Sequence, residues 1–145
     1  MSESEIKEIL QRYRVIAVVG LSGDQSKPSY EVAAYMQSHG YRIVPVNPNV
    51  GEVLGERSYK SLLEIPAETQ RQIEIVNLFR RAEDVLPVVE QVVKLKAVNG
   101  KPLVVWMQAG IVNEAAAAEA RRAGLMVVMD RCIMVEHARL IAGLR

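Results

Sequence analysis

The sequence predicts an α/β protein: a Rossmann-like, doubly wound sheet of five parallel strands, with helices on both faces in a three-layer α/β/α arrangement. Three observations predict this fold class. Five apolar runs are each too short to form a helix and are separated by longer stretches with helical spacing. The first run leads through a loop of glycine and serine into a helix start. The repeated alternation of strand and helix requires crossover connections, which favour a parallel sheet.

The first elements are indicated by spacing and by breaker residues. Apolar residues at helical spacing predict an amphipathic helix over 4–13, and the apolar run 15–19, bounded by Gly20, predicts a strand buried on both faces. Pro28 suits a first helical turn, whose free N–H groups Ser29 or Ser26 can cap, and this helix is expected to stop at Gly40.

The middle of the chain is less regular. Residues 42–47 are expected to form the second strand, although Pro45 cannot donate to a ladder and the strand is expected to be interior. A bulge or an early strand end would resolve this conflict. Residues 48–65 lack periodicity, and one short helical turn is expected at 61–64.

The second half repeats the alternation three times. Strands are expected at 73–78, 103–107 and 125–129. Helices are expected at 83–98, with Pro87 in the first turn, at 115–123, capped by Asn113 and ended by Gly124, and at 135–144.

Bulk properties restrict the function classes. The 145 residues are expected to form one domain, 1–145, and the formal net charge of +1 argues against non-specific nucleic-acid binding. No apolar run approaches the roughly 20 residues of a membrane span, and an acidic N-terminus is unlike a signal peptide, so a cytoplasmic protein without membrane contact is expected. One cysteine and two histidines predict neither a disulfide framework nor a metal site.

Ligands of open doubly wound sheets bind beyond the carboxyl ends of the strands, where the strand order reverses. The residues expected at those ends are small, amide-bearing or cationic: Gly20, Leu21, Ser22, Gly23, Asn47, Pro48, Phe79, Arg80, Arg81, Gln108, Gly110, Asp130, Arg131 and Cys132. They contain no adjacent nucleophile and base, so no catalytic residue is expected.

The loop 20–29 joins a strand to a helix start, where unpaired N–H groups and the helix dipole attract anions. The loop therefore predicts a site for the phosphates of a nucleotide-like ligand, with an ordinary strand-to-helix turn as the alternative. A nicotinamide dinucleotide is disfavoured but not excluded. The loop lacks the G-x-G-x-x-G spacing, and the second strand ends in Asn47 instead of an acidic residue.

Motifs stand at all five expected strand ends: Gly20-x-Ser22 with Pro28-Ser29, Asn47-Pro48, Leu54-Gly55, Phe79-Arg80, Trp106-x-Gln108-x-Gly110-Ile-Val-Asn-Glu114, and Val127-Val-Met-Asp-Arg-Cys132. Together they resemble one family, the CoA-binding domain proteins of the YccU-like type. The resemblance covers residues 6–136, and the fold is similar to the N-terminal domain of the succinyl-CoA synthetase α subunit.

The resemblance implies non-covalent binding of coenzyme A, or of an acyl-CoA, without a reaction. The ligand-binding residues it implies are Gly20, Leu21, Ser22, Gly23, Lys27, Pro28, Ser29, Asn47, Pro48, Phe79, Arg80, Arg81, Gln108, Gly110 and Cys132. Two positions depart from the family pattern: Lys27 stands where arginine is frequent, and Ile133 stands where proline is usual. The synthetase's phosphorylated histidine belongs to a domain that this sequence lacks.

Within that set, each residue is assigned to one part of the ligand, and each assignment has a purely structural alternative. Ser22, Gly23 and Ser29 would contact the diphosphate, or form only a turn and a cap. Asn47-Pro48 would lie beside the adenosine, or simply end a strand.

Lys27, Arg80 or Arg81 would hold a phosphate such as the 3′-phosphate, or the arginines would pair with Glu83 or Asp84. Gln108 and Gly110 would approach the pantetheine arm, whereas Trp106 is expected in the core and Asp130 is expected to order its loop.

Two further alternatives for the whole protein remain open: an NAD(P)-binding oxidoreductase, and a redox or ligand sensor that uses Cys132. A buried free cysteine is the structural alternative for Cys132. Neither histidine is expected to be catalytic: His39 is expected at a helix C-terminus and His137 at the surface.

Overall fold

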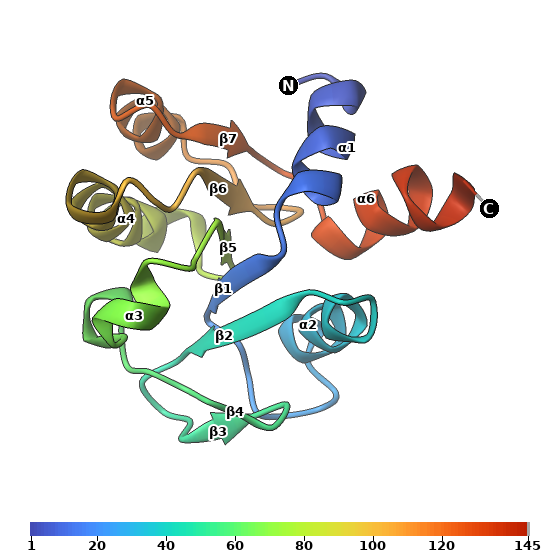
Figure 1. Ribbon diagram of the computed structural model, residues 1–145, viewed down its shortest axis with the longest axis horizontal. Coiled ribbons are helices and arrows are strands. Elements are labelled where there is room, and N and C mark those ends of the chain that lie inside the picture. The colour runs from blue at the N-terminus through green and yellow to red at the C-terminus, as the bar shows by residue number, and fades with distance from the viewer. Residues whose placement is uncertain (145) are drawn as a thin grey trace.

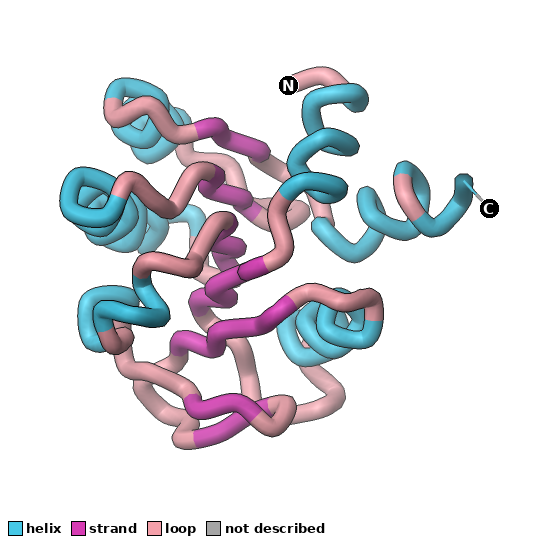
Figure 2. The backbone as a smooth tube through the Cα atoms, viewed as in Figure 1, coloured by secondary structure: helices cyan, strands magenta, loops and turns pink. Residues whose placement is uncertain are grey.

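A computed structural model describes residues 1–144 and has at its centre a five-stranded parallel sheet in the order β2-β1-β5-β6-β7 (Figures 1 and 2). The strands of this sheet are β1 (Val15–Val19), β2 (Arg42–Val46), β5 (Ile75–Leu78), β6 (Val104–Met107) and β7 (Met126–Val128). The predicted fold class is confirmed: the first predicted strand coincides with β1, and the other four differ from the observed strands by one or two residues at one or both ends.

Helices cover both faces of the sheet, as Figure 1 shows. One face carries α1 (Glu3–Arg12), α2 (Pro28–Ser38) and α6 (Ile133–Leu140), and the other carries α3 (Ala67–Gln70), α4 (Val85–Asn99) and α5 (Glu114–Arg122). None of the helices within residues 1–144 is long and apolar enough to cross a membrane.

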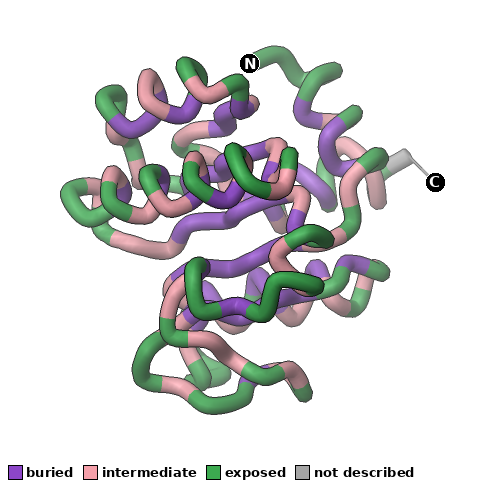
Figure 3. The backbone as a smooth tube through the Cα atoms, turned by 60° about the vertical axis from the view of Figure 1, so that its left-hand side comes forward, coloured by how far each residue is buried: buried purple, intermediate pink, exposed green. Residues whose placement is uncertain are grey.

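The central strands are buried from both sides (Figure 3). All four residues of β5 and all four of β6 are buried between the two helical layers, and all of them except Asn77 are apolar. Alternate residues point to opposite faces, so Val76 and Leu78 pack toward α4 and α5, whereas Val18 and Trp106 pack toward α2 and α6. The carboxyl ends of these strands are therefore held by a rigid core.

Pro45 is accommodated in a way the sequence did not predict. The expectation that the second strand is interior is wrong: β2 lies at the edge of the sheet and pairs in register with β1 alone, Pro45 opposite Val18. An edge position tolerates the missing N–H of proline. The carbonyl of Pro45 instead accepts the N–H of Tyr59, at 3.1 Å, from the loop that follows.

The irregular segment after β2 contains a small hairpin that periodicity does not reveal. Strand β3 (Glu52–Val53) pairs antiparallel with β4 (Glu56–Arg57) through a turn at Leu54 and Gly55, both with positive φ. The predicted helical turn at 61–64 is present as a 3₁₀ turn, Leu62–Glu64. This segment brings Tyr59 and its neighbours against the end of β2.

The C-terminal helix corrects one expectation about a side chain. The prediction that His137 lies at the surface is wrong, because its side chain is buried among Tyr35, His39 and Tyr41. Tyr35 Oη lies 3.0 Å from His137 Nδ1. His39 lies at the C-terminus of α2, as expected, with its Nδ1 2.8 Å from the Tyr35 carbonyl oxygen.

Candidate functional site

The strand order reverses at β1, where β2 lies on one side and β5 on the other. The chain after β1 enters α2 on one face, and the chain after β5 enters α4 on the opposite face. The two connections therefore diverge at the carboxyl edge, which is where ligands of such sheets bind. The loops Gly20–Lys27 and Phe79–Arg81 follow β1 and β5 at this edge.

Gly20 is required where these two loops meet. Its φ is +90°, and a Cβ added there would lie 2.3 Å from the carbonyl oxygen of Phe79. The loop begins with a hydrogen bond from the Gly20 N–H to the Val46 carbonyl, at 2.8 Å, so it is fixed to β2 as well. Any side chain at this position would push the two loops apart.

The loop after Gly20 is held by its own polar groups. The Ser22 N–H donates to Ser29 Oγ at 2.9 Å, and the Asp24 N–H donates to Ser22 Oγ at 3.0 Å. Asp24 Oδ1 accepts from the N–H and the hydroxyl of Ser26. These bonds hold the Asp24 carboxylate and lower its pKa, so the loop carries one negative charge beside the positive charge of Lys27.

The start of α2 differs from the sequence expectation in its capping. Lys27 occupies the N-cap position without a side-chain cap, and Pro28 is the first helical residue. Ser29 therefore lies inside the first turn instead of capping it, and Ser26 bonds to Asp24. Within residues 1–144, the N–H groups of Gly23, Ser29 and Tyr30 have no protein acceptor. Unpaired N–H groups at the start of a helix donate hydrogen bonds readily to a bound anion.

A hollow of about 150 Å³ lies at the ends of β1 and β2, on the face covered by α4. Apolar side chains form much of its wall, and two cations and two neutral polar groups border it. Its lining residues are Val19, Val46, Lys60, Ser61, Leu62, Arg80, Val88 and Gln91. An apolar slot with a few polar groups at its border is typical of a small-molecule site.

The two neighbouring arginines differ in what they contact. Arg81 is exposed and pairs with Asp84, at 2.9 Å, and with Glu83, at 3.5 Å, which is the alternative the sequence left open. Arg80 is half-buried, borders the hollow and has no ion-pair partner among residues 1–144. Arg80 is therefore the arginine available to a ligand's phosphate.

Sequence reasoning missed Lys60, Ser61 and Gln91 as candidates. Lys60 and Ser61 lie in the segment without periodicity, and they reach the sheet because Tyr59 pairs with Val46. Nothing in the sequence marks Lys60 as a ligand-binding residue, because it does not follow a predicted strand. Gln91 lies on α4, where it reads as an ordinary helix residue.

Beyond β6, the polar groups are used by the protein itself. Gln108 is buried, and its Oε1 accepts the Ile133 N–H at 3.0 Å, which caps α6. The Gly110 N–H donates to Asp130 Oδ1 at 2.6 Å, so Asp130 orders this loop, and Trp106 is in the core. Gly110 therefore leaves room for a ligand to approach, but its N–H group is not free to donate to one.

The remaining predicted residues follow β1, β2 and β7 at the carboxyl edge. Asn47 donates from Nδ2 to the Leu21 carbonyl at 2.9 Å, and its Oδ1 accepts the Asn49 N–H, so it supports the loop, and Pro48 follows exposed. Leu21 is fully buried beneath the loop. Cys132 is half-buried at the N-cap of α6, and its side chain makes no capping hydrogen bond.

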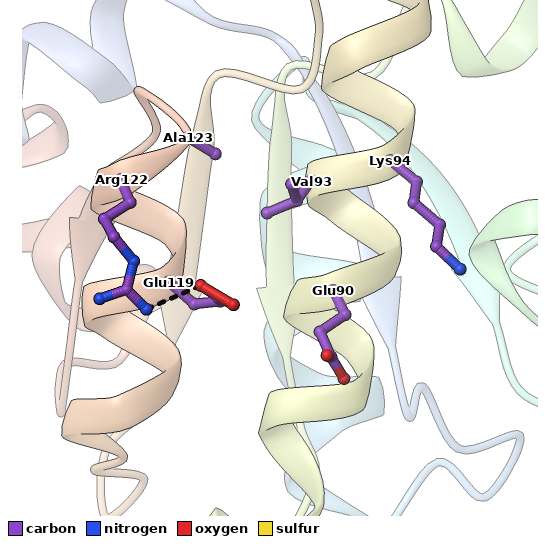
Figure 4. A pocket seen from close by; sticks show the side chains of 6 residues that line it. All are labelled: Glu90, Val93, Lys94, Glu119, Arg122 and Ala123. Carbon is purple, nitrogen blue, oxygen red and sulfur yellow. Dashed lines mark hydrogen bonds and ion pairs between the residues drawn. The ribbon is translucent and has the colours of Figure 1, made fainter.

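A second hollow, of about 450 Å³, lies away from this edge in an open groove between α4 and α5 (Figure 4). Its charged side chains include an ion pair between Arg122 and Glu119 at 2.8 Å. None of the residues predicted from the sequence lines it. In residues 1–144, no three His, Cys, Asp or Glu side chains lie close enough to hold a metal ion.

Comparison with known proteins adds a family to this geometry. Residues 14–138 match the sequence model of a family described as "CoA binding domain". YneT of Bacillus subtilis is 45% identical over 137 residues, which cover 94% of this chain and 95% of YneT. The α subunit of the ADP-forming acetate–CoA ligase II of Pyrococcus furiosus is 42% identical over 64 residues, only 14% of its length.

Solved structures share the whole architecture. A protein of Pyrococcus horikoshii superposes with a TM-score of 0.87 at 40% identity, covering 97% of this chain and 93% of that one. A Thermus thermophilus protein superposes with a TM-score of 0.84 at 35% identity, covering 97% and 100%.

Proposed function

The chain belongs to the CoA binding domain family, and on this premise we propose that it binds coenzyme A non-covalently at the carboxyl edge of its sheet, without breaking a bond in it. One observation carries the proposal: the carboxyl edge around β1 offers unpaired N–H groups at the start of α2 on one face and, on the other face, a hollow bordered by an arginine without an ion-pair partner among residues 1–144. These features suit the diphosphate and the phosphorylated adenosine of one ligand.

In the proposed arrangement the diphosphate binds at Ser22, Gly23 and Ser29, beside Lys27 and Pro28 and against Gly20. The adenosine enters the hollow between β2 and α4, near Asn47 and Pro48, and its 3′-phosphate meets Arg80, with Lys60 opposite. The pantetheine arm then runs past Phe79 toward Gln108, Gly110 and Cys132. Guanidinium and ammonium groups at a half-buried site discriminate a ligand with a phosphate from one without it.

The absence of a reaction is part of the proposal. Among the residues placed at this edge, the hydroxyls of Ser22 and Ser29 accept hydrogen bonds from loop amides, and the Asp24 carboxylate of the same loop accepts from Ser26. The two histidines lie against each other, His39 at the C-terminus of α2 and His137 within α6. A nucleophile needs a base within hydrogen-bond reach.

A thermal-shift panel of CoA, acetyl-CoA, dephospho-CoA, NAD, NADP and ATP tests the function. We expect CoA and acetyl-CoA to raise the melting temperature most, dephospho-CoA less, and NAD and NADP not at all, because ligands that bind only the folded state stabilise it. A shift with NAD or NADP and none with CoA would support the oxidoreductase alternative instead.

A further inference from the structure

Asn77 is a polar residue at the centre of the sheet whose side-chain carbonyl oxygen the fold leaves without a partner. It is the third residue of β5, 1% exposed, and its Oδ1 accepts no hydrogen bond from residues 1–144. Its register neighbours are Val18 on β1 and Trp106 on β6. Val18 has no polar side-chain group, and the single N–H of Trp106 already donates to the Arg131 carbonyl at 2.7 Å.

Such a residue is unfavourable for the unliganded protein. A buried acceptor that loses water and gains no donor lowers stability, and buried polar side chains in native proteins nearly always have a partner. An apolar residue would fit between Val18 and Trp106, as elsewhere in the sheet. Packing alone therefore does not account for an amide here.

The position of Asn77 connects it to the candidate site. In register with Val18 and Trp106, it faces the side covered by α2 and α6. Phe79, two residues further along, points to the same side and lies against Gly20 of the phosphate loop. Asn77 thus lies one step below the rim, with the half-buried Phe79 next to it on the same face.

The strand order says which part of the ligand passes over it. With the adenosine at β2 and the diphosphate at β1, the rest of the ligand continues over β5, β6 and β7, which spans three strand spacings, about 14 Å. This part of coenzyme A is the pantetheine arm, a flexible chain with two amide N–H donors. An unpaired carbonyl oxygen is the partner that such a donor requires.

We propose that Asn77 is the residue that recognises an amide of the pantetheine arm: the arm turns Phe79 aside and donates an N–H to Asn77 Oδ1. This inference depends on the proposed function, since it assumes that coenzyme A binds across β1 and β5. It assigns Asn77 a role in binding and none in chemistry.

Titration calorimetry with CoA and with adenosine 3′,5′-bisphosphate, which lacks the arm, tests the inference. We expect Asn77→Leu to bind CoA about tenfold more weakly than the unchanged chain, and the bisphosphate equally well. Asn99→Leu is the matched control, because Asn99 has the other buried amide group without a partner, at the far end of α4. It should leave both affinities unchanged.

The outcomes distinguish a failure of this inference from a failure of the proposed function. If the unchanged chain binds CoA and Asn77→Leu binds it as tightly, the inference is overturned and the proposed function stands. If the unchanged chain does not bind CoA, the proposed function fails and the inference with it.

Side-chain amide NMR of the unchanged chain provides a test that needs no variant and so does not depend on Asn77→Leu folding. The Asn77 NH₂ resonances should shift with CoA and stay in place with the bisphosphate. If the Asn77 NH₂ resonances do not shift when CoA is added, the assignment is overturned.

Discussion

Replacing Arg80 by glutamine tests how the site distinguishes coenzyme A from related nucleotides. Arg80 is half-buried and unpaired within residues 1–144, so its interaction with a phosphate lies between an exposed ion pair, about 0.2–1 kcal/mol, and a buried charged hydrogen bond, about 1.5–3 kcal/mol. An intermediate value of about 1.4 kcal/mol corresponds to a tenfold loss of affinity.

Calorimetry of four protein–ligand pairs isolates this contribution. Arg80→Gln should weaken CoA binding about tenfold and dephospho-CoA binding less than twofold, which makes the loss specific to the 3′-phosphate. Arg81→Gln is the matched control, because Arg81 is exposed and already paired with Glu83 and Asp84. Its effect on either ligand should stay below about twofold. Equal losses for CoA and dephospho-CoA in Arg80→Gln, or a larger loss in Arg81→Gln, would refute the reasoning.

Three further predictions concern the loop, the cysteine and the buried histidine. Gly20→Ala should lower the free energy of unfolding in urea by about 3 kcal/mol, from positive φ and overlap with Phe79, whereas Gly51→Ala, with open space around it, should change it by less than about 1 kcal/mol; similar losses in both would contradict this. Cys132→Ser should leave CoA affinity unchanged, since binding is proposed to be non-covalent; a large loss, or a CoA adduct on Cys132 by mass spectrometry, would favour the sensor alternative. Burial and the nearby His39 and Arg14 lower the pKa of His137 below its ordinary value of 6.5, so below that pH the unfolded chain binds more protons than the folded chain. The free energy of unfolding should therefore fall as pH drops through 6.5, by at most about 1.4 kcal/mol per pH unit. An equal fall in His137→Gln would assign the effect to another group.

The elements that were predicted correctly carry strong local signals. The five buried strands are short apolar runs, and Asn113 caps α5 as expected, its Oδ1 accepting the Ala116 N–H at 2.9 Å. Gly20 and the Gly40 that follows α2 take the positive φ angles their places imply. Local patterns of this kind depend little on the rest of the chain.

The errors arise where distant segments decide the outcome. Strand order is not encoded in β2 itself, so the tolerance of Pro45 could not be foreseen. The burial of His137 depends on α6 packing against α2, and the two aromatic residues beside it on α2 and its C-terminal loop lie about a hundred positions earlier in the chain. Ser29 or Ser26 was expected to cap α2, but the helix begins at Pro28, two residues before the start that a cap at Ser29 requires, and Ser26 bonds to Asp24.

The candidate site was predictable at its strand ends and not at its border. The rim residues follow from the rule that ligands bind at the carboxyl edge, and the resemblance to a family supplied the ligand. Lys60 and Gln91 come from a loop and a helix face whose approach to the hollow depends on tertiary packing. In the sequence, Asn77 is a single polar residue in an otherwise apolar strand. Only the missing hydrogen-bond donor to its Oδ1 distinguishes it from an ordinary buried amide.

The structure of the chain crystallised with coenzyme A tests the central claim most directly. We expect the diphosphate oxygens within hydrogen-bond distance of the Ser29 and Tyr30 N–H groups, and the 3′-phosphate beside Arg80. Coenzyme A bound elsewhere, for example in the groove between α4 and α5, with the start of α2 unoccupied, would contradict it.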